Sequence, residues 1–267
     1  MATSVGRTQE REPQFFARLG QTVVHEGELK RHSVYTRFLH WGYGICFFLA
    51  LFSGFATYLP FLFRWFAPLF GGPANTRMLH PWFGLGFVIF FGLQAINWWG
   101  PMKWTDVDTR WLKDLPEFLR SREPLEAEDV GMYNGGQKLQ FWEIVIGCIV
   151  YLITGIVMWA GARHFGAIAV AVSYILHDIS ALIMLFGIFF HLYQATFGQP
   201  GTIQAMTKGT VREAWAWTHA PAWYRQMTGR DPRQALEQER KRRLARERAI
   251  EQLSRGAATG PPGGGRA

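Results

Sequence analysis

Two histidines, His177 and His191, enclose an almost wholly apolar stretch of the sequence, HDISALIMLFGIFFH. An imidazole in apolar surroundings is costly unless it has a partner. Fourteen residues of α-helix span roughly 21 Å and complete almost a whole number of turns, so both rings lie on one face of such a helix. Two imidazoles that face each other across a helical bundle are suitable axial ligands for a haem iron. The stretch therefore predicts one metal-binding histidine near each end of a buried helix.

Four apolar stretches are long enough to cross a membrane as helices, because about 20 residues span a hydrocarbon core of roughly 30 Å. They cover residues 38–59, 80–99, 141–160 and 169–196. None of the 28 Lys and Arg residues lies inside them, and the only acids inside them are Glu143 and Asp178. A backbone that faces lipid must satisfy its own hydrogen bonds, which favours helices. The predicted fold class is an all-α integral membrane protein, a four-transmembrane-helix bundle that holds two b-type haems.

The basic residues predict the orientation of this bundle. Of the 28 Lys and Arg residues, 25 lie in the N-terminal arm, the 100–140 loop and the C-terminal tail, and 3 lie in the other two loops. Basic loops stay in the cytoplasm, so both termini and the 100–140 loop are expected there. The net charge of +8 is assigned to this rule and to the anionic headgroups of the lipid bilayer. A nucleic-acid partner is not expected, since no binding motif interrupts the charge run.

The chain is expected to divide into four parts. A cytoplasmic N-terminal arm (1–37) is basic, irregular and without the apolar core of a signal peptide. The four-helix di-haem transmembrane domain (38–196) includes the cytoplasmic loop 100–140. A cytoplasmic segment (197–229) leads to a charged, partly disordered tail (230–267), in which RQALEQERKRRLARERAIEQL is typical of a solvated helix and ATGPPGGGRA of disorder.

Two further histidines match the first two in depth. His40 opens the first apolar segment, which starts in the cytoplasm, and His80 opens the second, which starts outside. On the deduced orientation, His40 and His191 form an inner pair, and His80 and His177 form an outer pair. The orientation rests on Lys and Arg alone, so this match is independent support for two stacked haems. Taken singly, His40 could be an interfacial residue, and His80 could mark a helix start before Pro81.

Small and basic residues flank these histidines at helical spacing. Small residues one turn deeper leave room for a flat porphyrin, and arginines one turn outward could pair with haem propionates or reach lipid headgroups. The small residues are Gly44, Gly84, Ala181 and Gly187, and the arginines are Arg37 and Arg77.

The remaining histidines and the cysteines are given no part in this chemistry. His25, His32, His164 and His219 lie in polar regions and are expected on the surface. Cys46 and Cys148 are expected to be small core residues. The sequence has no Cys-x-x-Cys-His motif, which excludes a covalent c-type haem, and no His-Glu-x-x-His motif of zinc proteases.

Seven motifs between residues 35 and 226 occur in a characteristic order: RFLHW, RMLHP, EDVGMYNGGQK, ILHDISA, FFHLYQATF, GTIQAMTKGTVREAW and HAPAWYR. In these motifs the chain resembles the gamma subunit, a cytochrome b, of membrane-bound respiratory formate dehydrogenases. The resemblance implies four haem ligands, which are the four that spacing selects: His40, His80, His177 and His191. It also implies the bacterial inner membrane and a periplasmic catalytic (alpha) subunit with a molybdenum or tungsten pterin. An iron–sulfur (beta) subunit would pass electrons inward to two non-covalent haem b groups and a membrane quinone.

The loop VGMYNGGQK precedes the third apolar segment on the cytoplasmic side. Asn134 can donate and accept hydrogen bonds, and Gly135–Gly136 lets a ligand approach the backbone closely. Alternatively, NGG is a plain turn before a helix. The resemblance implies that this loop, through Asn134, Gly136 and Gln137, forms the quinone pocket with the His191 end of the inner haem. Candidate groups for a proton path from the cytoplasm are Asn134, Gln137, Lys138 and Glu143.

Two features depart from the family's pattern: Asp178 directly follows a predicted ligand, and a long basic tail follows Arg230. An alternative function is the cytochrome b subunit of a nickel–iron hydrogenase or a thiosulfate reductase. A third hypothesis is a membrane anchor without cofactors, or a small transporter. A transporter should have helices broken at the midplane, whereas no apolar segment has a central proline, and an anchor leaves four intramembrane histidines unexplained.

Overall fold

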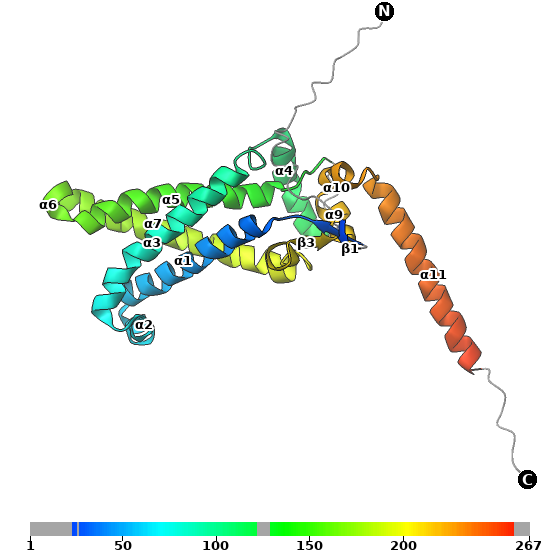
Figure 1. Cartoon of the computed structure of the whole chain (residues 1–267), viewed down its shortest axis with the longest axis horizontal. Helices are drawn as coiled ribbons and strands as arrows, with labels where there is room; N and C mark the ends of the chain where they lie inside the picture. The colour runs from blue at the N-terminus through cyan, green and yellow to red at the C-terminus, as the bar shows by residue number, and fades with distance from the viewer. Residues whose placement is uncertain (1–22, 26, 122–128, 259–267) are drawn as a thin grey trace, which may run out of the picture.

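The computed structural model describes residues 23–25, 27–121 and 129–258. Its main elements are four long helices that run side by side along the molecule (Figure 1). Within the described residues, these four are the helices long and apolar enough to cross a membrane. They are α1 (Val34–Tyr58), α3 (Pro73–Trp98), α5 (Gly135–Ala160) and α7 (Ala167–Tyr193).

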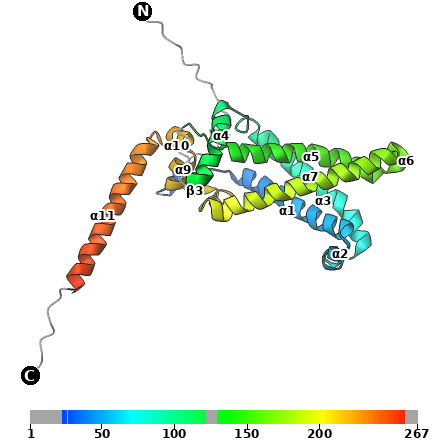
Figure 2. The ribbon, with the colours of Figure 1, turned by 180° about the vertical axis from the view of Figure 1, so that it is seen from behind.

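The four helices form two antiparallel hairpins. Helix α1 packs along α3, and α5 packs along α7, while α3 and α5 connect the hairpins. Figure 2 shows the same pairing from behind. The core between them is largely aromatic, because rings fill wide gaps between helices at little cost in conformational freedom. It is built from Tyr43, Phe47, Phe87, Phe91, Phe141, Ile144, Cys148 and Met184, with Cys46 packed against it, so both cysteines are core residues as expected.

All four helices begin earlier than hydropathy predicts, and the starts of α1 and α3 show the reason. Helix α1 starts at Val34, after Ser33, whose hydroxyl accepts a hydrogen bond from the backbone N–H of Thr36 at 3.1 Å. Helix α3 starts at Pro73, so Pro81 lies inside it. The alternative that His80 only marks a helix start is therefore wrong. The first turns of α1 and α3 are polar, so their hydropathy is low and the apolar pattern does not include them.

Short connections join the two helices of each hairpin. Helix α2 (Pro60–Phe66) and the 3-10 turn η1 (Ala67–Phe70) join α1 to α3. Helix α6 (Ala162–Phe165) joins α5 to α7 between two glycines with φ of 77° and 80°, Gly161 and Gly166. Such backbone angles suit glycine best, which lets the chain reverse within a few residues.

A small mixed layer covers the other end of the bundle. Its antiparallel sheet has the order β1 (Val23–His25), β2 (Glu28–Lys30) and β3 (Thr210–Arg212), with Leu29 opposite Val211. The expectation that residues 1–37 are irregular is therefore corrected for the described part of the arm, because strands of three residues carry no readable alternation. Three short helices surround the sheet: α8 (Gln204–Thr207), α9 (Glu213–His219) and α10 (Pro221–Thr228).

Two polar helices complete the chain. Helix α4 (Asp106–Ser121) lies in the 100–140 loop, and α11 (Pro232–Ala258) runs away from the bundle (Figure 1). Helix α11 confirms the predicted solvated helix of the tail, whereas most of the ATGPPGGGRA segment lies outside the described residues. After Tyr193, helix α7 continues as a π-helical turn, η2 (Gln194–Gly198).

Candidate functional site

The structure brings the four buried-segment histidines together as two facing pairs. His40 on α1 faces His191 on α7, with ring centres 6.1 Å apart and planes inclined by 41°. His80 on α3 faces His177 on α7, with ring centres 6.2 Å apart and planes inclined by 61°. These are the pairs expected from the sequence. The His40 end of α1 is tied to the mixed layer, because the indole of Trp41 donates to the carbonyl of Met206 at 3.1 Å.

Both pairs fit a metal ion between the rings. When two imidazoles bind the same metal ion from opposite sides, each through a bond of about 2.0 Å, their ring centres lie about 6 Å apart. In the described part of the chain, no group of three or more His, Cys, Asp or Glu side chains is placed to hold a metal ion. Two imidazoles alone leave most of the coordination to another ligand, as in a haem, whose macrocycle supplies four nitrogens. The residues present therefore fit a bis-histidine haem at each end of the bundle.

The helices that carry each pair leave room for a flat group. Along the described residues, α7 packs against α5, and its backbone is not packed along α1 or α3. Each histidine pair nevertheless joins α7 to one of those two helices. The facing rings thus connect helices of different hairpins whose backbones stay apart, which is the arrangement that a porphyrin between them requires.

Hydroxyl groups of neighbouring helices hold the outer histidines. The Ser53 hydroxyl lies 3.0 Å from Nδ1 of His80, and the Thr154 hydroxyl lies 2.9 Å from Nδ1 of His177. Gly54 lets His80 approach α1, since a Cβ atom there would lie 3.3 Å from Cε1 of the ring. No sequence pattern pointed to these three residues. Ser and Thr in an apolar helix ordinarily donate their hydroxyl hydrogen bonds to a carbonyl of the same helix, and glycine is common in membrane helices.

The inner histidines have aromatic neighbours instead. The His40 ring meets Tyr43 edge-on at 5.1 Å and Trp41 at 5.5 Å between ring centres. Nδ1 of His40 is buried and has no hydrogen-bond partner within the described residues. The two sites therefore differ in the polar groups around their ligands.

The predicted small residues fall into two groups. A Cβ atom added at Gly44 or Gly84 would meet no atom within 4 Å, so these helix faces are free beside His40 and His80. Ala181 is half-buried on α7. At Gly187 the added Cβ would lie 2.3 Å from a carboxylate oxygen of Glu143. The missing side chain of Gly187 accommodates Glu143, which is a different reason for glycine from the one that the spacing suggested.

The two predicted arginines lie at opposite ends of the bundle. Arg37 donates from Nη1 to the carbonyl of Thr207 at 2.7 Å, and its Nε is buried without a partner among the described residues. Arg77 is exposed on α3. Arg37 thus has a buried donor near the inner pair, while Arg77 is free to reach either a propionate or a lipid headgroup.

Asn134 and Gln137 form the N-terminal cap of α5. Oδ1 of Asn134 accepts from the N–H of Gln137 at 3.0 Å, and Oε1 of Gln137 accepts from the N–H of Asn134 at 3.1 Å. This reciprocal pair is a capping box. Both side chains have a structural role in addition to any contact with a ligand.

The two glycines of this loop accommodate an indole ring. A Cβ atom at Gly135 would lie 2.9 Å from Cε3 of Trp111, and one at Gly136 would lie 3.0 Å from its Cη2. Trp111 belongs to α4, so the glycines let α4 pack on the beginning of α5. The sequence pattern attributed their small size to the approach of a ligand.

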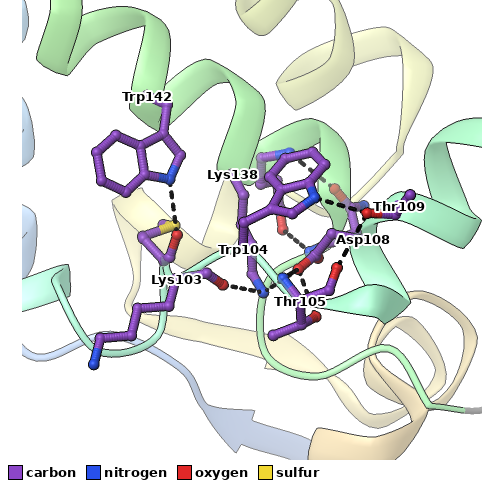
Figure 3. Close-up of polar contacts among 10 residues, drawn as sticks. Lys103, Trp104, Thr105, Asp108, Thr109, Lys138 and Trp142 are labelled. Atoms are coloured by element: carbon purple, nitrogen blue, oxygen red, sulfur yellow. Dashed lines mark hydrogen bonds and ion pairs between the residues drawn. The ribbon is translucent and has the colours of Figure 1, made fainter.

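Lys138 lies in a buried ion pair beside this cap (Figure 3). Its Nζ donates to Oδ2 of Asp108 at 2.7 Å and to the carbonyl of Lys103 at 3.0 Å. The same carboxylate oxygen accepts from the backbone N–H and the hydroxyl of Thr105, at 2.8 Å and 2.7 Å. In addition, the indole of Trp142 donates to the carbonyl of Met102 at 3.0 Å. These contacts fix the 102–109 segment onto α5.

His32 is buried, which corrects the expectation that it lies on the surface. Only 5% of it is exposed, and its ring stacks on Tyr133 with 6.1 Å between centres. Burial lowers the pKa of His32 well below its ordinary value, and the positive charges of Arg31 and Arg37 lower it further. Burial also lowers the pKa of the neighbouring Arg31 to about 10. By contrast, His164 is exposed as expected, and His219 is half-buried against Trp215.

Asp178, the acid next to an outer histidine, has a partner on α1. The Tyr58 hydroxyl lies near its carboxylate, where it favours the charged form. This contact joins α7 to the end of α1 beside the outer pair, and it offsets part of the cost of an acid in an apolar helix.

Comparison with known proteins identifies the family of this chain. Residues 31–209 match the prokaryotic cytochrome b561 family. The chain belongs to this family. The cytochrome is 36% identical over 196 residues to the cytochrome b556 subunit of the nitrate-inducible formate dehydrogenase of Escherichia coli strain K12, which covers 72% of this chain and 88% of that protein.

Two further relatives carry similar names. The cytochrome is 33% identical over 206 residues to the formate dehydrogenase cytochrome b556 subunit of Haemophilus influenzae, covering 76% of this chain and 85% of that protein. It is 32% identical over 199 residues to a second formate dehydrogenase cytochrome b556 subunit of Escherichia coli strain K12. This match covers 74% of this chain and 92% of that protein. These likenesses confirm the resemblance seen in the sequence motifs, and the family supports b-type haem as the cofactor.

Proposed function

We propose that this cytochrome is the membrane subunit of a formate dehydrogenase and carries electrons across the bilayer to a quinone. The observation that carries the proposal is the two facing histidine pairs at opposite ends of four apolar helices. The names of the relatives, all formate dehydrogenase subunits, support the choice of complex over a hydrogenase or a thiosulfate reductase. The chain acts as the quinone-reducing electron-transfer subunit and not as the subunit that oxidises formate.

Two haem b groups would be held by side chains of the bundle. His40 and His191 would bind the inner iron, and His80 and His177 the outer iron. A bound haem supplies an iron that accepts and releases one electron. The open helix faces at Gly44 and Gly84 and the small Ala181 would lie against the macrocycles, while Arg37 and Arg77 would pair with propionates.

The proposed partners lie on the outer side of the membrane. A catalytic (alpha) subunit with molybdenum or tungsten would oxidise formate, and an iron–sulfur (beta) subunit would deliver the electrons to the His80–His177 end. The charge distribution supports this orientation, with both termini in the cytoplasm and the chain in the bacterial inner membrane. Electrons then leave the chain at the His40–His191 end.

The quinone would bind where α5 begins, beside the inner pair. The cap uses Oδ1 of Asn134, so the amide nitrogen of this residue takes no part in it and can donate to a quinone carbonyl. Gly136 and Gln137 would line the same pocket together with His191. Asn134 would thus hold both the helix and the substrate.

Quinone reduction at this end would consume protons from the cytoplasm. The buried ion pair with Asp108 makes Lys138 a structural group and leaves Glu143 as the better candidate for a proton path. Gln140 donates to Oε2 of Glu143 at 2.7 Å, whereas Oε1 is buried without a partner among the described residues. An unsatisfied buried oxygen is expensive, and a proton or a water molecule would satisfy it.

The experiment that tests the proposal is isolation of the complete complex from membranes. We expect the chain to co-purify with an iron–sulfur subunit and a formate-oxidising subunit, to contain two b-type haems, and to show reduced haem bands when formate is added. The quinone should reoxidise these bands. A purified chain without haem bands would contradict the proposal and favour the anchor, while different partner subunits would favour the hydrogenase or thiosulfate reductase alternative.

A further inference from the structure

The two outer histidines share a feature that neither inner histidine has among the described residues. Each has its Nδ1 within hydrogen-bond distance of a buried hydroxyl on a neighbouring helix, Ser53 of α1 for His80 and Thr154 of α5 for His177. Ser53 is 0% exposed and Thr154 is 3% exposed. Nδ1 of His40, in the inner pair, is buried with no partner in the described part of the chain.

The two hydroxyls act as acceptors toward the imidazoles. Ser53 is 2.7 Å from the carbonyl of Leu49 and 3.0 Å from that of Ala50, and Thr154 is 2.6 Å from the carbonyl of Val150. A hydroxyl has a single proton, and a backbone carbonyl can only accept it. The oxygen that remains can accept a hydrogen bond from an Nδ1–H group. The contacts therefore favour the tautomer of His80 and His177 that has its proton on Nδ1.

We propose that Ser53 and Thr154 are positioning residues of the outer haem site, which fix the tautomer and tune the iron. The inference rests on the proposed function, in which His80 and His177 bind a haem. With the proton held on Nδ1, the lone pair of each ring is on Nε2, where the iron can use it. A ligand histidine commonly donates its other N–H to a fixed acceptor, which sets the orientation of the ring and raises its basicity.

The same hydrogen bonds should lower the reduction potential of the outer haem. An acceptor at Nδ1 increases the electron density of the imidazole and so stabilises the oxidised iron. The acceptor is strengthened because each hydroxyl itself donates to a carbonyl, and chains of hydrogen bonds polarise one another. Among the described residues, neither His40 nor His191 has a hydroxyl partner, so the asymmetry would make electron transfer from an outer haem to an inner haem more favourable.

Ordinary helix chemistry does not account for these contacts. Ser and Thr in apolar helices often donate to a carbonyl one turn back, and Thr57 and Thr196 do this at 2.9–3.2 Å and 2.6 Å. Within the described residues, neither Thr57 nor Thr196 has a hydrogen bond to a histidine. In the part of the chain that the structure describes, only Ser53 and Thr154 add one, and Gly54 allows it at Ser53 by letting His80 approach α1. Thr57 and Thr196 are therefore matched controls.

The test uses the complete complex with Thr154→Val, Thr154→Ser and Ser53→Ala, and with Thr57→Val and Thr196→Val as controls. Redox titration followed by visible absorption gives the midpoint potential of each haem, and electron paramagnetic resonance gives its low-spin signal. In Thr154→Val and Ser53→Ala, one haem should shift to a higher potential with a changed low-spin signal, and the other should stay unchanged. Thr154→Ser and both controls should resemble the wild type.

Haem retention gives a second criterion, because loss of such a supporting group commonly lowers metal affinity about 10-fold or more. Loss of the outer haem in Thr154→Val but not in Thr154→Ser would also support the proposal. Equal loss in both variants, or an unchanged potential and signal in Thr154→Val and Ser53→Ala with both haems present, would overturn it. If His80→Ala and His177→Ala kept both haems, the ligand assignment itself would be wrong. Loss of a haem in His80→Ala and His177→Ala, together with unaltered potentials in Thr154→Val and Ser53→Ala, would instead keep the ligand assignment and overturn only the role of the two hydroxyls.

Discussion

At the scale of single residues, the paired histidines allow the two proposed haems to be removed one at a time. His40 and His80 lie at opposite ends of the bundle, and each faces its own partner on α7. His80→Ala or His177→Ala should remove the outer haem, and His40→Ala or His191→Ala the inner one. Haem content per chain measures this, with the exposed His164→Ala as a control that keeps both. Loss of the same haem in His40→Ala and His80→Ala would contradict the assignment.

Asn134 needs two variants, because it caps α5 as well as lying in the proposed quinone pocket. Asn134→Ala removes both functions and should cost about 1 kcal/mol of stability through the lost cap. Asn134→Asp keeps an oxygen acceptor for the N–H of Gln137, removes the amide donor and adds a negative charge, which is favourable at a helix N-terminus. We expect slower quinone reduction in both variants with both haems bound, and lower thermal stability in Asn134→Ala alone. Normal quinone kinetics in Asn134→Asp would show that the loop is only a helix cap.

His32 should make stability depend on pH. Its folded-state pKa is lowered well below 6.5 by burial and by the charges of Arg31 and Arg37. Below pH 6.5 the unfolded chain therefore binds a proton that the folded chain does not, and stability falls as pH falls by up to about 1.4 kcal/mol per pH unit. Thermal denaturation in detergent between pH 7.5 and about 5 measures this.

The variant His32→Phe tests the assignment of that slope. In this variant the free energy of unfolding should depend less on pH than in the wild type, by the contribution of about one proton. His164→Gln, at an exposed site, should keep the full slope. Parallel pH profiles of His32→Phe and the wild type would mean that another group causes the acid sensitivity.

Spacing found the histidines but not the residues that support them. His177 and His191 are readable because two imidazoles in one apolar helix are rare and costly. Ser53 and Thr154 look like ordinary hydroxyls until the neighbouring helix is placed beside them. His32 sits among charged residues in the sequence, yet distant aromatic residues, Trp98 and Tyr133, bury it. Partners of this kind are set by tertiary packing and leave no local pattern.

At the scale of the elements, the contact between the 102–109 segment and α5 depends on a buried charge pair. Asp108 is 2% exposed and Lys138 is 7% exposed. Lys138→Met would leave the Asp108 carboxylate buried without its cation and should cost about 3–5 kcal/mol. Thermal unfolding followed by tryptophan fluorescence measures the loss. The double variant Lys138→Met/Asp108→Asn should recover part of it.

The control for this variant is an exposed ion pair between α4 and Asp129. Arg110 pairs with Asp129, and both side chains are at least half exposed. Arg110→Ala should therefore cost about 1 kcal/mol or less. A loss as small as this in Lys138→Met would show that Asp108 is satisfied by Thr105 alone, through the two hydrogen bonds that this residue donates.

Hydropathy predicted the existence of the four long helices better than their ends. The apolar stretches correspond to α1, α3, α5 and α7, but α3 starts seven residues before His80 because its first turns are polar. The sheet could not be predicted, because its strands have three residues each and β2 pairs with β3 across the length of the chain. The hydroxyl of Thr210 donates to Glu28, 182 residues away.

At the scale of the whole molecule, the direction of electron flow can be measured. Entry at the His80–His177 end and quinone reduction at the other end move negative charge inward, against a field worth roughly 2.3 kcal/mol per charge per 100 mV. In oriented liposomes that contain the complete complex, formate should alkalise the cytoplasmic-side compartment and make it electrically negative. A pH-sensitive dye and a potential-sensitive dye report the two effects. Quinone reduction without a membrane potential would place both sites on the same side of the membrane.

Helix α7 supplies one histidine to each pair, and it is the last of the four long helices to leave the ribosome. Neither pair exists while only α1, α3 and α5 have been made. Strand β3 and helices α8–α10 follow α7 in the chain, so the layer that ties down the start of α1 also forms last. A haem held by either pair, as proposed, would therefore gain its second histidine only after the fourth long helix has been made.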